Sequence, residues 1–227
     1  MRKHRQFNNK DSGENSGRLA VPVALPFDYE LRPAANGAPR ELILLLHGFA
    51  ESGARIMEKL EPHLPADATV LAPDGPFPMP HKTDNGYVMT HSWYLYDPTT
   101  KEYFIDMQLA IGFLAAGIAQ LKLEHLPKRI IGFSQGGYLA PFAAQKLTDV
   151  RQIVGIASEY LAEEISGALP PRLDSIHGTL DDVVAIADAR KGHQALIGRG
   201  VSGTFHEIEG SAHRIDGNIR KKLKELL

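Results

Sequence analysis

Ser134 has the neighbours that a nucleophilic serine requires. It lies in Gly-Phe-Ser-Gln-Gly-Gly, residues 132–137, which matches the pattern G-x-S-x-G. The apolar run RIIGF precedes it and the small-residue stretch GGYLAPFAA follows it. This order predicts a strand, a sharp turn and a helix, the context in which such a serine is exposed for attack. A glycine-rich turn with an incidental serine is the alternative, and the flanking elements favour the nucleophile.

The acid that would accompany this serine is Asp181 or Asp182. A serine nucleophile needs a base and an orienting acid, and with this kind of turn they follow in the order serine, acid, histidine. Both aspartates stand in the turn after a strand predicted at 172–177, and a residue just past the end of a parallel strand projects into the site crevice. We expect Asp182 to cap a helix that starts at Val183, which leaves Asp181 for the site.

The base must be one of three histidines that follow. His193 falls in the middle of a predicted helix, where a surface histidine is expected, and His206 falls within a strand, where a structural role is expected. His213 stands in Gly-Ser-Ala-His, a turn between that strand and the last helix. The sequence therefore predicts His213 as the general base.

Two backbone N–H groups are candidates for an oxyanion hole. Gln135 directly precedes the helix predicted behind the serine, where N–H groups and the positive end of the helix dipole favour a developing anion. The second donor comes from the loop after an early strand, and Phe49 follows Leu46-His47-Gly48. His47 precedes the nucleophile strand, so a structural hydrogen-bonding role is expected for it.

Composition excludes several other kinds of chemistry. The 227 residues contain no cysteine, which excludes disulfides, thiolate metal sites and cysteine nucleophiles. Neither H-x-x-x-H nor H-E-x-x-H occurs, so a metalloenzyme is the weakest hypothesis and we predict no metal and no cofactor.

The 25 basic and 27 acidic residues nearly balance, and no apolar stretch approaches the ~20 residues of a membrane helix. We therefore expect no nucleic-acid partner, no stable membrane association and a cytoplasmic location.

Strand and helix patterns alternate along most of the chain, which predicts an α/β protein with a mostly parallel central sheet and helices on both faces. We expect one domain over residues 18–227. Strands are predicted at 19–25, 27–31, 41–46, 68–72, 129–133, 152–157, 172–177 and 204–208. Helices are predicted at 51–60, 101–125, 136–147, 183–196 and 215–227.

Two segments fall outside this alternation. Residues 1–17 are polar, with Arg2, Lys3 and Arg5 near the start, and cannot bury enough apolar surface to offset the entropy of ordering. We expect a disordered, solvated tail rather than an anionic docking arm. Residues 73–100 are rich in proline and predict a long irregular connection. It carries Trp93, Tyr94 and Tyr96, which either line the substrate pocket or cover the edge of the core.

With these residues in view, the chain resembles the phospholipase/carboxylesterase family of α/β-hydrolases, which includes the acyl-protein thioesterases. The resemblance runs from about residue 35 to the C-terminus and rests on LLLHGFAESG, APDGPFP, SWY, GFSQGG, HGTLDDVV and GSAH. It implies Ser134, Asp181 and His213 as a triad and the Phe49 and Gln135 N–H groups as the oxyanion hole. It also implies ester or thioester substrates, no cofactor and a rudimentary lid.

The sequence departs from the family pattern at two places. The family usually has H-G-x-G-D after the early strand, whereas this chain has Ala50 and Glu51 at the last two positions. Glu159 also stands where the family favours a small residue. Both changes bear on substrate range more than on the reaction.

The leading hypothesis is therefore a serine hydrolase that cleaves carboxylic esters, lysophospholipids or thioesters through an acyl-enzyme on Ser134. An acyltransferase that uses the same triad and a non-catalytic, ligand-sensing protein are the alternatives. The usual mark of the latter, a missing triad member, is not found here. A homodimer is compatible with the sequence.

Overall fold

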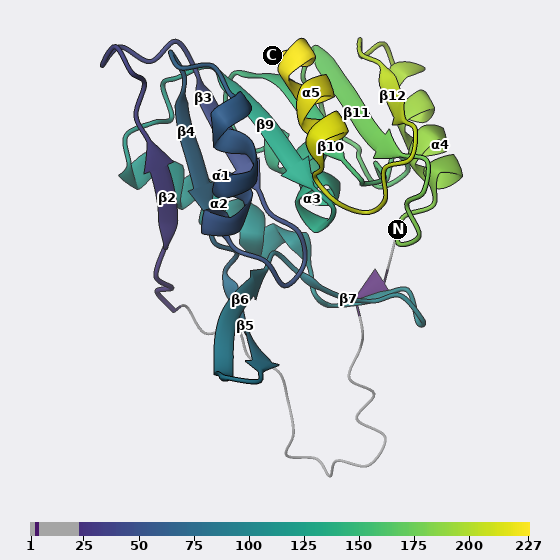
Figure 1. The fold of residues 1–227 in the computed structure, drawn as a ribbon, viewed down its shortest axis with the longest axis horizontal. Helices are drawn as coiled ribbons and strands as arrows, with labels where there is room; N and C mark the ends of the chain where they lie inside the picture. Colours follow the sequence, from purple (N-terminus) through teal and green to yellow (C-terminus); the bar gives the residue numbers. More distant parts are fainter. Residues whose placement is uncertain (1–2, 5–22) are drawn as a thin grey trace.

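A seven-stranded sheet forms the centre of the computed structural model, which describes residues 3–4 and 23–227 (Figure 1). The strand order is β12-β11-β10-β9-β3-β4-β2. Six strands are parallel, and only the edge strand β2 is antiparallel to its neighbour. The strands are β2 (Tyr29–Arg32), β3 (Leu42–Leu46), β4 (Thr69–Pro73), β9 (Lys128–Phe133), β10 (Val150–Ile156), β11 (Arg172–Gly178) and β12 (Phe205–Ile208). The predicted mostly parallel sheet is confirmed.

Helices cover both faces of this sheet. Helices α1 (Gly53–Leu60) and α5 (Gly217–Leu226) pack on one face. Helices α2 (Met107–Gln120), α3 (Gln135–Ala144) and α4 (Ile186–Ile197) pack on the other. This arrangement gives the chain two hydrophobic cores, one on each side of the sheet.

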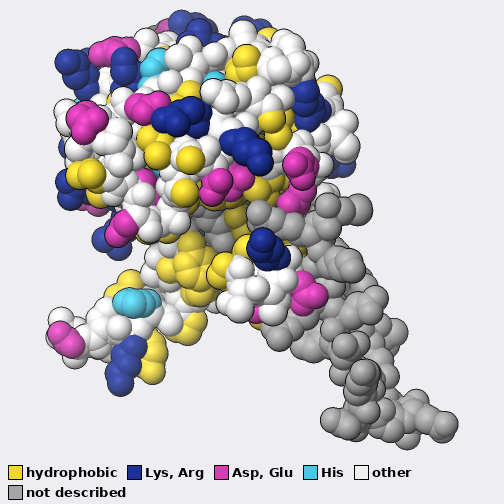
Figure 2. Space-filling view, turned by 90° about the vertical axis from the view of Figure 1, so that its right-hand side faces the viewer, with side chains coloured by type: hydrophobic (Ala, Val, Ile, Leu, Met, Phe, Trp, Pro, Cys, Tyr) yellow, Lys and Arg dark blue, Asp and Glu magenta, His cyan; other side chains and the backbone are white. Residues whose placement is uncertain are grey.

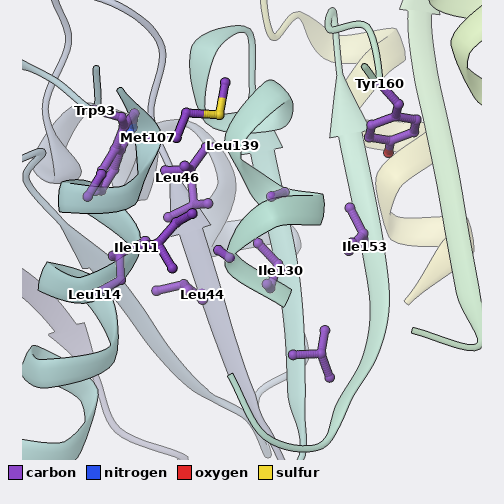
Figure 3. Close-up of a cluster of buried hydrophobic side chains, with 14 of the residues drawn as sticks. Leu44, Leu46, Trp93, Met107, Ile111, Leu114, Ile130, Leu139, Ile153 and Tyr160 are labelled. Atoms are coloured by element: carbon purple, nitrogen blue, oxygen red, sulfur yellow. The ribbon is translucent and has the colours of Figure 1, made fainter. Parts of the chain in front are cut away.

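Strand β3 shows why the central strands have continuous apolar sequences. Successive side chains of a strand point to opposite faces. Leu44 and Leu46 accordingly join the core beneath α2 and α3 (Figure 3), whereas Ile43 and Leu45 join the core beneath α1 and α5. All five residues of β3 are completely buried. A strand buried on both faces needs apolar residues at every position, as the run LILLL provides.

Several predicted elements have different bounds. Of the two early strands, only β2 is present among the described residues, and 23–28 is not a strand. The expected irregular connection at 73–100 contains the hairpin β5 (Phe77–Thr83) and β6 (Gly86–Ser92), followed by β7 (Leu95–Asp97). The predicted helix 101–125 is β8 (Glu102–Ile105) followed by α2, because Asp106 caps α2 by accepting the N–H of Gln108.

The predicted N-terminal tail lies mostly outside the described residues. Within it, Lys3–His4 form the short strand β1, which pairs in parallel with β8. This pairing differs from the prediction of a solvated tail for these two residues, because main-chain hydrogen bonding to a strand edge does not depend on apolar side chains.

The β5–β6 hairpin projects from the body of the molecule (Figure 1). Tyr87, Val88 and Met89 on β6 are largely exposed. On the body, Lys, Arg, Asp and Glu side chains are interspersed over the face in Figure 2, in keeping with the near balance of charges in the sequence. Within residues 3–4 and 23–227, no helix is long and apolar enough to cross a membrane.

Candidate active site

Ser134 occupies a sharp turn between β9 and α3. Its backbone angles are φ 48° and ψ −117°, in a region that residues with side chains rarely adopt. Such strain costs on the order of 1–3 kcal/mol and persists only where the surrounding structure enforces it. Here the Ser134 N–H donates to the carbonyl of Ile156 on the neighbouring strand at 2.9 Å. The Ser134 carbonyl in turn accepts the N–H groups of Gly137 and Tyr138.

The glycines on either side of Ser134 make this turn sterically feasible. A Cβ atom at Gly132 would lie 2.4 Å from the carbonyl oxygen of Gly136. A Cβ atom at Gly136 would lie 2.2 Å from the carbonyl oxygen of Leu46 on β3. Helix α3 therefore starts in direct contact with the backbones of two strands, which only glycine permits.

The three residues selected from the sequence lie in a continuous chain of hydrogen bonds. Ser134 Oγ is 3.0 Å from His213 Nε2. On the other side of the imidazole, Nδ1 is 2.9 Å from Asp181 Oδ2 and 3.0 Å from Oδ1. The Asp181 side chain is fully buried and the His213 side chain is 16% exposed. In this geometry Nδ1–H donates to the carboxylate, which leaves Nε2 free to accept the proton of the serine hydroxyl.

Asp181 also organises the turn in which it lies. Its Oδ1 accepts the N–H groups of Val183 at 3.0 Å and Val184 at 2.8 Å. The prediction that Asp182 caps a helix from Val183 is wrong, because α4 begins only at Ile186 and Asp182 is exposed. The carboxylate that faces His213 is the same one that satisfies the backbone donors of the turn.

The turn that holds Asp181 and the turn that holds His213 are bonded to each other. The Leu180 N–H donates to the Ser211 carbonyl at 2.9 Å, and the Gly210 N–H donates to Thr179 Oγ1 at 3.0 Å. Gly178 allows this approach, because a Cβ atom there would lie 2.1 Å from the Ser211 carbonyl oxygen. The relative position of acid and base is therefore set by backbone contacts.

The loop after β3 holds Phe49, the predicted second oxyanion donor. Ala50 has φ 55° where the family usually has glycine, so the loop keeps a left-handed turn despite the side chain. Glu51 supports the loop, since its carboxylate accepts the Gly48 N–H at 3.1 Å and pairs with Lys59 at 2.6 Å. The Phe49 side chain is 53% exposed. Gln135, the predicted first donor, starts α3, where N–H groups have no partner within the helix.

His47 has the structural hydrogen-bonding role that we expected. Its Nε2 accepts the Gly75 N–H at 3.0 Å, so Nδ1 carries the proton and donates to the Gly48 carbonyl at 2.7 Å. Burial lowers the pKa of His47 to about 4, against smaller opposing effects of the Gly48 carbonyl and of nearby carboxylates. The neutral ring thus joins the loop after β3 to the segment after β4.

Trp93 and Tyr94 lie in the core rather than at the surface. Trp93 is completely buried, its indole N–H donates to the His47 carbonyl at 2.9 Å, and its ring packs on the His47 ring. Tyr94 is 7% exposed. These contacts favour the alternative that the aromatic residues of 73–100 cover the core over the interpretation that they line the substrate pocket.

The other two histidines considered as a base are elsewhere. His193 is not a surface residue as predicted: it is 3% exposed, and its Nδ1 lies 2.9 Å from Ser175 Oγ. A helical position alone did not reveal that this face of α4 packs against β11. His206 lies in β12, as expected.

Glu159, the second departure from the family pattern, lines a cavity of about 510 Å³ between 100–102, 159–164 and α4. Glu159 directly follows Ser158. The Ser158 side chain lies so close to Gly137, in the first turn of α3, that a Cβ atom at Gly137 would collide with it. Among the residues that the structure describes, no group of three or more His, Asp or Glu side chains is arranged to hold a metal ion.

A mostly parallel sheet with helices on both faces, a strained serine after one strand and a histidine and aspartate from later turns together define the α/β-hydrolase class. Residues 33–227 match the family model described as Phospholipase/Carboxylesterase. The chain therefore belongs to this family and is a hydrolase of the esterase type, which confirms the resemblance found in the sequence.

Solved structures share this fold. Esterase PE8 is 25% identical, with 88% of this chain and 97% of that chain covered and a TM-score of 0.67. Acyl-protein thioesterase 2 from Zea mays is 20% identical, with 88% and 96% covered and a TM-score of 0.65. A Bacillus cereus carboxylesterase is 17% identical, with 88% and 92% covered and a TM-score of 0.67. A comparison with curated protein sequences found no match.

Proposed function

We propose that this protein hydrolyses carboxylic esters or thioesters through a covalent acyl-enzyme on Ser134. The observation that carries the proposal is the chain of contacts from Ser134 Oγ to His213 and from His213 to Asp181, each between 2.9 and 3.0 Å. A serine hydroxyl is a weak nucleophile, and an adjacent base oriented by an acid is what activates it.

The reaction would proceed in two steps. His213 Nε2 takes the hydroxyl proton as Ser134 Oγ attacks the carbonyl carbon, and the protonated imidazole then gives this proton to the leaving alcohol or thiol. In the second step His213 takes a proton from water as the water oxygen attacks the acyl carbonyl. The protonated imidazole then gives this proton to Ser134 Oγ as the acyl–Oγ bond breaks, which releases the carboxylic acid and restores the free serine hydroxyl. Asp181 stays ionised in both steps, orients the imidazole and stabilises its charge.

We assign the oxyanion hole to the backbone N–H groups of Gln135 and Phe49. Support for Gln135 comes from its place at the start of α3, where the helix dipole favours negative charge. Support for Phe49 comes from the left-handed turn at Ala50 and from the hydrogen bond that the Gly48 N–H donates to the Glu51 carboxylate, which hold its loop in one conformation. Preorganised donors of this kind are each worth roughly 10² to 10³ in rate.

We propose small esters and thioesters, lysophospholipids among them, as substrates. One structural neighbour is an esterase and another is an acyl-protein thioesterase, so both classes of leaving group belong in the test. The mechanism as proposed uses neither a cofactor nor a metal ion.

Two measurements on the purified protein test this proposal. The first compares kcat/KM for p-nitrophenyl esters and acyl thioesters over a range of chain lengths. The second treats the protein with a fluorophosphonate and locates the label by peptide mass spectrometry. Turnover with label on Ser134 is the expected result. A label on another serine, or no turnover of any ester or thioester by the folded protein, would refute the proposal.

A further inference from the structure

His177 lies next to the catalytic acid but has no place in the mechanism above. It stands near the end of β11 and is completely buried. Its Nε2 is 2.9 Å from the carbonyl oxygen of Val184 and 3.3 Å from Asp181 Oδ2. A buried histidine this close to a triad carboxylate is positioned to influence it.

The neighbours of the His177 ring determine where its proton lies. The Val184 carbonyl and the Asp181 carboxylate can only accept hydrogen bonds. Nε2 must therefore carry a proton, which it donates to the Val184 carbonyl, and Asp181 Oδ2 lies beside the same N–H group, 3.3 Å from Nε2. Nδ1 is buried without a hydrogen-bond partner among the described residues. Burial lowers the pKa of His177, and the nearby Val184 carbonyl and Asp181 oppose this effect only partly. The ring thus acts as a neutral donor.

The three residues form a closed set of contacts. The Val184 N–H donates to Asp181 Oδ1 at 2.8 Å, and the Val184 carbonyl accepts from His177. His177 is therefore connected to the carboxylate by hydrogen bonds through the Val184 peptide, which binds Oδ1, and its Nε2–H dipole also lies 3.3 Å from the charged Oδ2. Because Oδ2 also faces His213 Nδ1 at 2.9 Å, the orientation of the carboxylate toward the base depends on this set.

We propose that His177 is a positioning residue for Asp181: its Nε2–H group fixes the carboxylate in the orientation that accepts the Nδ1–H of His213. This inference rests on the proposed serine mechanism. Without the donor, the carboxylate can rotate away from His213, which then loses both its orientation and the partner of its Nδ1–H. A misplacement of about 1 Å in a catalytic group costs up to about 10²-fold in rate.

A purely structural role is the competing interpretation, because His177 also binds the Val184 carbonyl and stacks on Phe205, with ring centroids 6.1 Å apart. The two interpretations differ in what a variant does to the folded enzyme. Loss of packing lowers stability and leaves each folded molecule fully active. Loss of positioning lowers kcat in folded molecules and leaves KM nearly unchanged, since substrate contacts are not altered.

The experiment compares three variants with the wild type. His177→Phe keeps an aromatic ring and removes the donor, whereas His177→Gln keeps an N–H donor at a similar distance from the backbone. His193→Phe is the matched control: His193 is also buried and contacts the same Phe205, but it bonds to Ser175 and not to Asp181. For each variant, kcat and KM are measured per folded molecule, with unfolding followed by circular dichroism. NMR with 15N-labelled histidine reports which nitrogen of His213 and of His177 carries the proton, independently of turnover.

We expect His177→Phe to lower kcat roughly 10- to 100-fold with KM within about twofold, and to weaken the preference of His213 for the Nδ1–H tautomer. His177→Gln should recover most of the lost kcat, and His193→Phe should lose stability alone. The proposal is overturned if His177→Phe keeps the wild-type kcat and His213 tautomer, if Gln and Phe lose kcat equally, or if wild-type His177 carries its proton on Nδ1. An inactive wild type would instead refute the proposed function, and the two tautomer measurements would still decide the role of His177.

Discussion

The side chain of Gln135, the residue after the nucleophile, is hydrogen-bonded at both ends to the segment that holds Trp93. Its Oε1 accepts the Trp93 N–H and its Nε2 donates to the Tyr94 carbonyl, both at 2.9 Å. These backbone groups are buried, so the bonds fix the start of α3 against the segment after the β5–β6 hairpin. Trp93 in turn donates to the His47 carbonyl, which extends the connection to the loop that holds Phe49.

Loss of the Gln135 side chain should therefore destabilise the protein. Gln135→Ala removes the acceptor of the buried Trp93 N–H and a donor to the Tyr94 carbonyl, and a buried polar group that loses its partner costs about 1–3 kcal/mol. We expect the free energy of unfolding to fall by about 2–4 kcal/mol in urea denaturation. Lys146→Ala, on an exposed position after the same helix, is the control and should change it by less than about 0.5 kcal/mol. If Gln135→Ala changes the free energy of unfolding as little as the control does, the hydrogen bonds of the Gln135 side chain do not stabilise the fold as described.

Removal of the nucleophile should abolish turnover without affecting the fold. Because Ser134 Oγ is the atom in contact with His213 Nε2, Ser134→Ala should lower kcat by about 10⁴-fold or more. Steady-state kinetics and circular dichroism measure the two properties. The substitution also removes the fluorophosphonate label, and label that persists would assign the nucleophile to another residue.

The two neighbouring aspartates should behave very differently. Asp181→Asn removes the charge that holds the imidazole and favours the wrong tautomer, so kcat should fall by up to about 10⁴-fold. Asp182 is exposed and does not cap α4, so Asp182→Ala should leave kcat within about twofold and the free energy of unfolding within about 0.5 kcal/mol. Kinetics and denaturation of both variants check the assignment, which is reversed if Asp182→Ala alone abolishes turnover.

The left-handed conformation of Ala50 makes the Phe49 loop sensitive to the size of the side chain. Valine is strongly disfavoured at a positive φ, so Ala50→Val should displace the Phe49 N–H and lower kcat roughly 10- to 100-fold, in line with a lost oxyanion donor. Glycine adopts this conformation freely, and Ala50→Gly should keep kcat within about twofold. If the two variants are equally active in steady-state assays, the Phe49 N–H is not part of the oxyanion hole.

His47 should make the protein less stable in mild acid. Its pKa is about 4 when folded and 6.5 as the ordinary value, so the unfolded chain binds a proton in this range and the folded chain does not. The free energy of unfolding should fall as pH drops from about 6.5 to 4, by up to about 3 kcal/mol from this residue. Urea denaturation at several pH values checks this, with His47→Gln as the comparison. The variant should show a shallower pH dependence, and an identical slope would mean that His47 does not contribute.

Much of the site could be predicted from the sequence because its parts are local. Gly132, Ser134 and Gly136 identify the turn within a few residues, since only that spacing lets a helix start against two strands. His213 could be selected because it alone among the later histidines stands in a turn after a strand. The parallel sheet followed from the alternation of apolar strands and helices, with β3 apolar at every position.

The tertiary structure decided what depends on contacts between distant segments. Asp181 rather than Asp182 binds the backbone donors of its turn, because β11, α4 and the His213 turn meet there. Trp93 is a core residue because Gln135 and His47 supply its hydrogen-bond partners from 42 and 46 residues away. Contacts between separate elements also bury two histidines. His193 on α4 packs against Phe205 and bonds to Ser175 of β11. His177 of β11 stacks on Phe205 and bonds to the Val184 carbonyl. Residue types and local spacing specify which turns and helices form, whereas burial and hydrogen-bond partners arise only when the sheet brings separate elements together.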